Sequence, residues 1–356
     1  MAYTTIDDPS VFFNTVLYTG NQQVRNITFG GNSDLALNWI WLKSRSSGYA
    51  GNHHVYDSVR GVQKHLRPNL ASAEGTNGGT DGVTAFGSNG FTVGANTGSN
   101  ENNITYVGWG WKAGTSFTND ASSTSVGSID SAGSVNTDAG FSIITYTGTG
   151  SNATVAHGLG VAPTWILLRD RDSGDHDWFN FHKALGNGKY MRLNSDDAAA
   201  THSTIWNDTS PTSSVFSIGT NVNLNDNGNN FVAYCFAEKK GFSKFGSYIG
   251  NGNANGSFIY TGFKPAWIMY KNSESGSSNW EITDNKRAGY NSANARLLAN
   301  TNGAEDTGPR IDILSNGFKH RSSGNPESNK SGEVYVFMAF AESPFVTSTG
   351  IPATAQ

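Results

Sequence analysis

The chain has 356 residues, more than one hydrophobic core usually organises, so two or three domains are expected. Charged residues are only 15% of the chain and the net charge is −4, which excludes a general attraction for nucleic acid or an anionic membrane. Polarity comes instead from Gly, Asn, Ser and Thr, while aromatic residues at 12% exclude a disordered composition. No run of 18 apolar residues predicts a membrane span, and no signal peptide is expected at the N-terminus. The single cysteine, Cys235, excludes an intrachain disulfide framework.

The first predicted strands belong to a pattern that occurs three times along the chain. The pattern consists of a Tyr-bearing strand at residues 17–21, 145–149 and 247–251, a Trp-led strand at 39–43, 165–169 and 267–271, and a closing aromatic strand at 106–111, 231–236 and 335–340. The spacing from each Trp-led strand to its closing strand agrees between the copies to within two residues. We therefore interpret the chain as a tandem repeat.

The repeated strands are typical of β-structure because they are short, apolar, and bounded by Gly, Pro, Asn and Ser. In the second closing strand, Val232, Tyr234 and Phe236 are expected to line one face. In the first copy, Gly108 and Gly110 keep the opposite face small, which predicts close approach of another layer. The sequence thus predicts an all-β fold of three tandem homologous modules, β-sandwich-like or jelly-roll-like, each of about 100 residues.

The domain boundaries follow from the repeat and from composition. They are module 1 at residues 1–113 with a short N-terminal arm, a Ser/Thr/Gly-rich linker at 114–139, module 2 at 140–240, and module 3 at 241–356 with a C-terminal tail. Val126, Ile129 and Val135 leave open that part of the linker is a strand. The second junction is short and resembles a hairpin at residues 239–241, so modules 2 and 3 are expected to share a sheet or a firm interface, while module 1 can swing.

The aromatic residues divide into repeated and unrepeated positions. Trp39, Trp165 and Trp267 recur at equivalent places, which favours a role in the core. Trp41 and Trp206 have no aromatic counterparts, so they are candidates for an exposed surface on which a sugar can stack. The predicted ligand-binding residues are Trp41, Tyr49, His53 and Trp206.

One acidic loop is a candidate metal site. Around a Gly turn in module 2 stand four carboxylates, Asp170, Asp172, Asp175 and Asp177. An oxygen-rich loop of this kind is what Ca²⁺ selects, and the equivalent turns of the other modules lack the carboxylates. The alternative is a solvated hairpin loop in which Arg171 neutralises part of the charge. The adjacent His53 and His54 are a poor chelate, because neighbouring strand residues point to opposite faces.

No catalytic residue or cofactor is predicted. The sequence contains no phosphate-binding loop, nucleophile elbow, His-Glu-x-x-His pair or Cys-x-x-Cys pair. A glycosidase needs two acids flanking one cleft. Asp57 and Asp284 occupy equivalent positions, but the remaining copy has His182 there, which favours a structural role. We therefore expect a protein that is not an enzyme.

Several motifs carry a family resemblance. Residues 3–9, 12–15, 17–21 and 56–61, together with the Gly-x-x-Pro approaches at 160–163 and 262–265, resemble repeat modules of virion structural proteins, often called tail-fibre-like, from marine tailed phages that infect cyanobacteria and related hosts. The resemblance covers nearly the whole chain, although the first copy departs from the pattern at residues 31–38. It implies a location on the virion surface, on tail or capsid, after assembly in the host cytoplasm, and it supplies no catalytic residues.

The resemblance implies a function class with alternatives. The leading expectation is a tail-fibre or spike component that contacts host-surface polysaccharide through loops that differ between copies. The alternatives are a capsid decoration or head-fibre protein, and a stand-alone carbohydrate-binding module. The expected partners are other virion proteins and host polysaccharide, with no nucleic acid. Three copies also suit a homotrimer or a pseudo-threefold position in an assembly.

Overall fold

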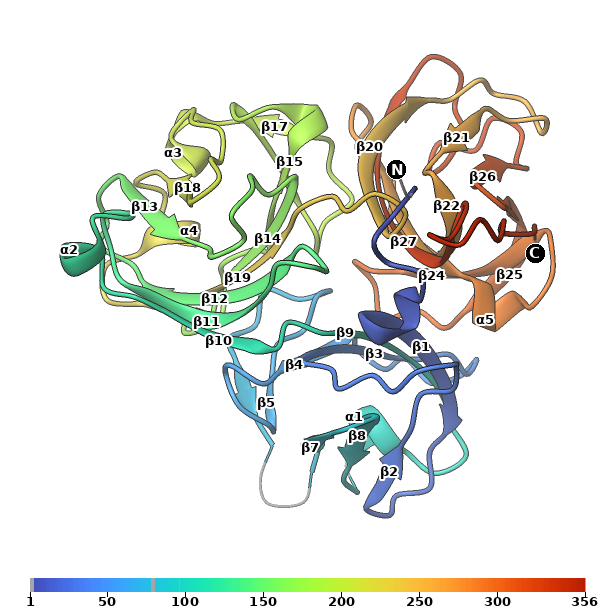
Figure 1. Ribbon diagram of the computed structural model, residues 1–356, viewed down its shortest axis with the longest axis horizontal. Helices are drawn as coiled ribbons and strands as arrows, with labels where there is room; N and C mark the ends of the chain where they lie inside the picture. Colours follow the sequence, from blue (N-terminus) through green and yellow to red (C-terminus); the bar gives the residue numbers. More distant parts are fainter. Residues whose placement is uncertain (1–2, 78–80, 96, 356) are drawn as a thin grey trace.

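The computed structural model describes residues 3–77, 81–95 and 97–355, and β-strands dominate it, as Figure 1 shows. The expected all-β class is confirmed. Helical structure in the described residues is confined to turns of three or four residues: η1 (Pro9–Val11), α1 (Thr97–Asn100), α2 (Ala121–Thr124), η2 (Lys183–Leu185), α3 (Ser203–Trp206), α4 (Val222–Asn225) and α5 (Asn285–Ala288). None of these described helices is long and apolar enough to cross a membrane.

Three segments of the chain each build an antiparallel sheet around a Trp-led strand. We call residues 13–111 the first segment, 115–236 the second and 243–344 the third. The strand order in the first segment is β1 (Phe13–Thr19), β9 (Thr105–Trp111), β3 (Trp39–Ser44), β4 (His54–Asp57). In the second segment it is β12 (Phe141–Thr147), β19 (Asn230–Phe236), β14 (Trp165–Asp170), β15 (Phe179–His182). In the third segment it is β20 (Ser243–Ile249), β27 (Val334–Pro344), β22 (Phe263–Asn272), β23 (Glu281–Asp284). The registers also correspond, because Trp39 pairs with Trp111, Trp165 with Phe236, and Trp267 with Phe340.

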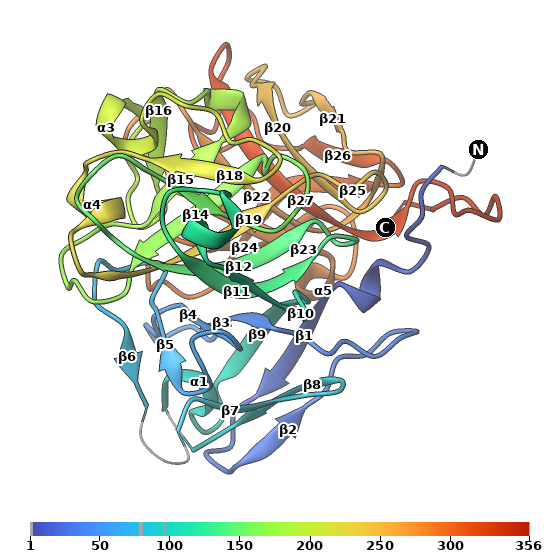
Figure 2. The ribbon, with the colours of Figure 1, turned by 60° about the vertical axis from the view of Figure 1, so that its left-hand side comes forward.

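A second layer of strands covers one face of each central sheet, which makes the segments sandwich-like. The layer consists of β2 (Arg25–Ile27), β8 (Gly90–Val93) and β7 (Val83–Gly87) in the first segment; β13 (Ala153–Ala156) and β18 (Val215–Ile218) in the second; and β24 (Ala293–Leu298), β25 (Asp306–Leu314), β26 (Gly317–His320) and β21 (Phe258–Tyr260), which continue the sheet of the third. Four further short strands are β5 (Lys64–His65), β6 (Gly75–Thr76), β16 (Lys189–Arg192) and β17 (Ala200–Thr201). Figure 2 shows β2, β7 and β8 beneath the central sheet of the first segment.

Alternation along the strands sends each face of a central sheet to a different core. Ile40 and Leu42 face the inner core of the first segment, while Trp39 and Trp41 face the opposite way. The expected small face is present there too. A Cβ on Gly110 would lie 2.7 Å from Cζ of Phe29, which follows β2, so a larger residue here would have to displace that ring.

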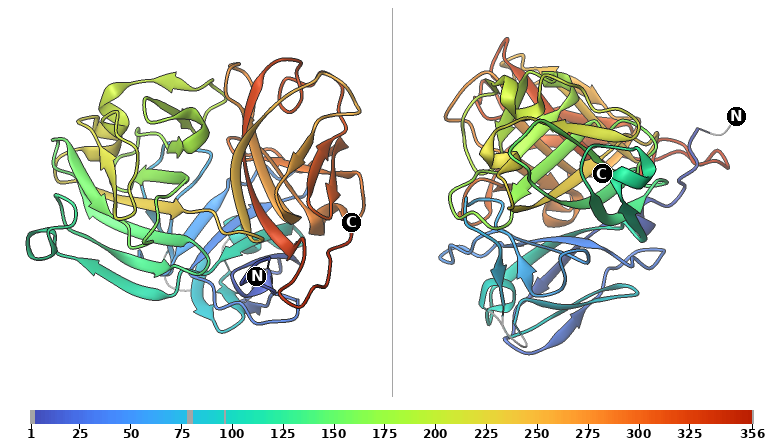
Figure 3. Two further views of the ribbon diagram at one scale, coloured as in Figure 1. Left: turned by 45° about the horizontal axis from the view of Figure 1, so that its top comes forward. Right: turned by 90° about the vertical axis from the view of Figure 1, so that its left-hand side faces the viewer.

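The outward faces of the three sheets meet in one shared aromatic core. Figure 1 shows three lobes around a common centre, and the right-hand view of Figure 3 shows the first segment, in blue, below the other two. Trp39, Trp165 and Trp267 are each 0% exposed, which confirms their predicted role in the core. Trp39 stacks on Tyr234 of the second segment, with ring centroids 4.6 Å apart. Trp267 meets Trp111 of the first segment edge-to-face at 5.7 Å. All three segments therefore depend on the same buried aromatic cluster.

The predicted linker at residues 114–139 is wrong, because most of the stretch is folded into the second sheet. It forms β10 (Thr115–Asn119), α2 and β11 (Ser131–Asn136), and β11 pairs with β12. Phe117, Ile129 and Val135 pack against the inner core of the second segment. These few apolar side chains anchor a hairpin whose Ser and Thr residues satisfy the sheet without contributing much to the core.

The second junction makes a tight turn at the predicted place, with an antiparallel bridge between Lys239 and Ser243. It connects β19 to β20, which lie in different sheets, so of the two expected arrangements the second and third segments share an interface and not a sheet. The first segment packs into the shared core, so the prediction that it can swing on a linker is wrong. The N-terminal arm lies against the third segment: Tyr3 Oη donates to Gly262 O at 2.7 Å, and Ile6 is buried in the shared core.

Candidate functional site

The contacts between the three segments form a closed ring. At each contact a ring nitrogen from the residue that precedes β4, β15 or β23 donates to a main-chain carbonyl of a neighbouring segment. The pairs are Trp178 Nε1 to Arg67 O at 2.9 Å, Trp280 Nε1 to Arg192 O at 2.9 Å, and His53 Nε2 to Leu298 O at 3.0 Å. The second segment thus donates a hydrogen bond to the first, the third donates to the second, and the first donates to the third.

Main-chain hydrogen bonds repeat the same ring. They run from Glu74 N to Arg171 O at 2.7 Å, from Ala199 N to Ser273 O at 2.9 Å, and from Glu305 N to Arg45 O at 3.1 Å. These bonds join the first segment to the second, the second to the third, and the third to the first. A head-to-tail contact that recurs in this way closes into a ring when its rotation allows.

A buried ion network fills the contact between the first and second segments. Arg60 Nε lies 2.5 Å from Asp57 Oδ2, and both side chains are fully buried. Glu74 accepts from Arg60 at 2.9 Å and from Arg171 of the second segment at 3.0 Å. Tyr234 of the second segment donates its hydroxyl to Asp57 at 2.7 Å. Burial alone would raise the pKa of Glu74, but the two arginines outweigh it and hold this pKa below its usual value.

The contact between the third and first segments contains the same network. Arg287 Nε lies 2.6 Å from Asp284 Oδ2, and Arg287 Nη1 lies 3.2 Å from Glu305. Arg45 of the first segment pairs with Glu305 at 2.9 Å. Trp109 of the first segment donates its indole N–H to Asp284 at 2.9 Å. Each buried charge in this network has an opposite charge or a hydrogen bond, which is the condition for tolerating it inside a protein.

The contact between the second and third segments has lost this network at every position. The equivalent residues are His182, Leu185, Ala199, Ser273 and Met338. His182 contacts Phe337 O through Nε2 at 3.3 Å, and burial lowers its pKa to about 4, so it is neutral near neutral pH. Leu185 and Ala199 pack against the shared core. One contact of the ring is therefore uncharged at these five positions, where the other two contacts are ionic.

The equivalent acids that the sequence singled out thus bridge segments. Asp57 and Asp284 also accept main-chain N–H groups of their own turns, from Arg60 at 2.8 Å and from Arg287 at 2.9 Å. The glutamates that pair with the same arginines, Glu74 and Glu305, were missed from the sequence. A signal for the arginines was present, because an Asp-x-x-Arg pattern stands at residues 57–60 and again at 284–287.

The structure corrects three of the four predicted ligand-binding residues. Trp41 and His53 are both 0% exposed, and Trp41 Nε1 donates to His53 Nδ1 at 2.8 Å. Trp206 is 2% exposed and packs against Phe181, with ring centroids 5.8 Å apart. Only Tyr49 reaches a surface pocket, of about 310 Å³, which it lines together with polar side chains. The predicted residues therefore do not form one sugar-stacking surface.

The four aspartates of the acidic loop are not brought together. Asp170 is buried and accepts from His176 Nδ1 at 2.7 Å, while Asp172 accepts from the main chain of Asn230 at 2.7 Å. Asp175 accepts from Ser173, and Asp177 pairs with Arg192 at 2.9 Å. Arg171, expected to neutralise the loop, instead pairs with Glu74. Within the described residues, no group of three or more His, Cys, Asp or Glu residues is arranged to hold a metal ion.

We expect calcium to leave the stability of the protein unchanged. The carboxylates of residues 170–177 are engaged by separate partners, so binding Ca²⁺ would require breaking several hydrogen bonds of the loop. Thermal unfolding in millimolar calcium and in chelator should give the same Tm. A Tm that rises with calcium concentration would restore the predicted site, because a ligand of the folded state raises the unfolding temperature.

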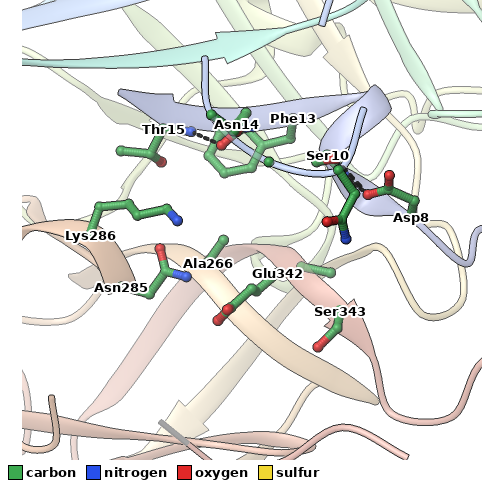
Figure 4. Close-up of a pocket in the computed structure, with 14 residues that line it drawn as sticks. Asp8, Ser10, Phe13, Asn14, Thr15, Ala266, Asn285, Lys286, Glu342 and Ser343 are labelled. Atoms are coloured by element: carbon green, nitrogen blue, oxygen red, sulfur yellow. Dashed lines mark hydrogen bonds between the residues drawn. The ribbon is translucent and has the colours of Figure 1, made fainter. Parts of the chain in front are cut away.

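A polar pocket of about 280 Å³ lies between the first and third segments, and Figure 4 shows its lining. Lys286 and Glu342 extend into it from the third segment, with Asn14 and Thr15 opposite. Glu342 is paired with Lys264 at 3.0 Å, and the buried Thr15 hydroxyl has no hydrogen-bond partner in the described structure. The chemistry available here is hydrogen bonding to a small polar molecule or to water.

Comparison with protein families places this arrangement in a known group. A domain of unknown function, DUF7483, matches residues 8–344. The chain belongs to this family. The match spans all three segments, so the DUF7483 unit in this chain is the whole ring rather than one repeat. No curated protein matches the chain.

The buried histidines of this DUF7483 chain predict acid sensitivity. Burial lowers the pKa of six of them: to about 3 for His54 and His320, to about 4 for His65, His157 and His182, and well below the usual 6.5 for His53. They are neutral in the folded state at neutral pH, whereas unfolded histidines bind protons near pH 6.5. Their stabilising contribution is therefore complete above about pH 6.5 and is lost as pH falls toward about 4.

One buried carboxyl group has the opposite effect on how stability depends on pH. Burial raises the pKa of Glu281 from 4.5 to about 7, so its contribution to stability declines as pH rises through that interval. Six histidines outweigh this single carboxyl, and urea midpoints should fall from about pH 6.5 to about pH 4. A midpoint that is constant across this interval would mean that these histidines are already accessible to solvent protons.

Proposed function

We propose that this protein is a non-enzymatic structural component of a tailed-phage particle, of the tail-fibre or spike type, built from three tandem copies of one β-sandwich-like module. The observation that carries the proposal is the closed ring of three segments with one strand order and equivalent contacts. A single chain arranged in this way reproduces the geometry of a trimer and suits a threefold position in a larger assembly.

The distribution of charge supports a structural role. The acids and bases that could act as catalytic groups at the segment contacts, Asp57, Arg60 and Glu74 among them, are paired with one another and buried. The proposed location is the virion surface, after assembly in the host cytoplasm. Loops that differ between the segments would contact host polysaccharide weakly, and many copies on one particle would supply the avidity.

A capsid decoration or head-fibre protein is the second candidate, and the compactness of the chain favours it. The accessible surface is 12512 Å² for a mass of 37.9 kDa. A compact monomer of this mass is expected to expose roughly 14,000 Å². The chain is therefore no extended shaft, which favours a body docked on a shell over a fibre shaft.

Two binding measurements with one protein preparation separate the candidates. A fibre or spike component should bind host cells when displayed multivalently, should bind poorly as a monomer, and should be blocked by host polysaccharide. A decoration protein should bind stoichiometrically to capsid shells that lack it and should ignore cells in both formats. A stand-alone carbohydrate-binding module should bind polysaccharide as a monomer and be absent from purified particles, an outcome that would contradict both virion candidates.

A further inference from the structure

A second pocket lies where the N-terminal arm crosses the third segment. Its volume is about 390 Å³, within the range of small-molecule sites. The arm supplies Tyr3, the second junction supplies Glu238 and Lys240, and the edge strand β21 supplies Tyr260. Figure 1 shows the dark-blue arm running along the third segment.

The two tyrosines give this pocket a fixed aromatic wall. Their hydroxyl oxygens lie 3.2 Å apart, and Tyr3 also donates to Gly262 O. The Tyr3 ring packs edge-to-face against Phe345, with centroids 6.1 Å apart. Tyr260 nevertheless remains 53% exposed. An anchored aromatic side chain with an open surface offers contact area at little entropic cost.

The charges at the pocket are unbalanced toward positive. Lys240 is exposed, and its Nζ lies 4.5 Å from the centroid of the Tyr3 ring. Glu238 is engaged by Lys244 at 3.2 Å. Among the described residues, no carboxylate lies within ion-pair distance of Lys240. Because Glu238 and Lys244 neutralise each other, the charge of Lys240 is left over at the pocket and favours an anionic ligand there.

We propose that this pocket binds an acidic sugar residue of a polysaccharide. Its carboxylate pairs with Lys240, and the apolar C–H face of its ring packs on Tyr260. Sugar hydroxyls then meet the polar groups of the pocket, including the two tyrosine hydroxyls and Glu238. The proposal rests on the proposed function for the source of the polysaccharide, and it identifies an acidic rather than a neutral polymer as the ligand.

The test is a calorimetric titration of the purified full chain with oligogalacturonate, and with malto-oligosaccharide of equal length as the neutral probe. Tyr260→Ala and Lys240→Gln should each weaken binding of the acidic oligomer by about tenfold. The matched controls are Tyr290→Ala, at an 81% exposed tyrosine outside the pocket, and Lys189→Gln, at an exposed lysine of β16 outside it; both should leave binding unchanged. Thermal unfolding of each variant establishes that it is folded, which is expected because Tyr260 is half exposed.

Two outcomes would overturn the site: no heat with oligogalacturonate at millimolar concentration, or equal binding of the acidic and neutral oligomers. Binding that is unaffected by both pocket variants would also overturn it. The titration needs no virion, so its failure leaves the structural role standing. Conversely, acidic-sugar binding by a protein that is absent from purified particles would remove the virion function and leave the site.

Discussion

Trp267→Ala should lower the free energy of unfolding by about 3–5 kcal/mol, the cost of truncating a fully buried Trp. Trp267 is 0% exposed and meets Trp111 of the first segment at 5.7 Å and Phe340 of its own segment at 5.8 Å. The cavity would therefore open at the centre of the ring, and the loss should affect cooperative unfolding of all three segments. Guanidinium unfolding followed by circular dichroism measures the effect.

Trp267→Phe is the matched control. The indole N–H of Trp267 makes no hydrogen bond in the described structure, so phenylalanine removes volume but strands no partner. Trp165 differs because its Nε1 donates to Asn180 Oδ1 at 2.9 Å. Trp165→Phe should therefore cost more than Trp267→Phe, since it leaves a buried acceptor unpaired. An unchanged midpoint for Trp267→Ala would contradict the shared core.

Arg60→Leu should destabilise the protein by about 3–5 kcal/mol, because it leaves Asp57 as a fully buried carboxylate without its ion-pair partner and removes one of the two arginines that pair with Glu74. The chain itself contains the control. Its contact between the second and third segments has His, Leu, Ala, Ser and Met at the network positions. We expect the fivefold variant that copies this set, Asp57→His, Arg60→Leu, Glu74→Ala, Arg171→Ser and Tyr234→Met, to be more stable than Arg60→Leu alone.

The comparison is made by guanidinium midpoints of the wild type, the single variant and the fivefold variant. Replacing a complete buried ion network by apolar groups can be nearly neutral, whereas removing one member is costly. A fivefold variant less stable than Arg60→Leu would show that the two kinds of contact are not interchangeable at this place in the ring.

The strands and their buried faces were predictable because the period-2 pattern is local and occurs three times. Trp39, Trp165 and Trp267 show this directly. The prediction that Trp41 is exposed is wrong, because the lack of an aromatic counterpart does not by itself indicate exposure. Its equivalents, Leu167 and Met269, are both buried and apolar, and residue 41 lies on the same strand face as residue 39. The apolar character shared by the three equivalent positions, and not their aromaticity, indicates that the position is buried.

The predictions that are wrong or missing concern residues whose interaction partners lie far away in the sequence. Residues 114–139 have the composition of a linker, but β12 supplies a strand edge on which they pair. Asp172 and Asp177 resemble calcium ligands until Asn230 and Arg192 are folded beside them. Glu74 meets Arg171 only because two segments are docked. Composition indicates which interactions a side chain can make, whereas the fold determines which partner lies next to it.

Because all three segments lie on one chain, the residues of one contact between segments can be substituted without altering the other two contacts. In a homotrimer, one substitution alters three identical interfaces together, and the ring dissociates on dilution. Here the closing contact, between Glu305 and Arg45, is intramolecular, so the ring is expected to survive at any protein concentration. The contact at His182 and Leu185 is uncharged, while its two counterparts are ionic. Covalent linkage thus allows the three contacts of one ring to differ from one another.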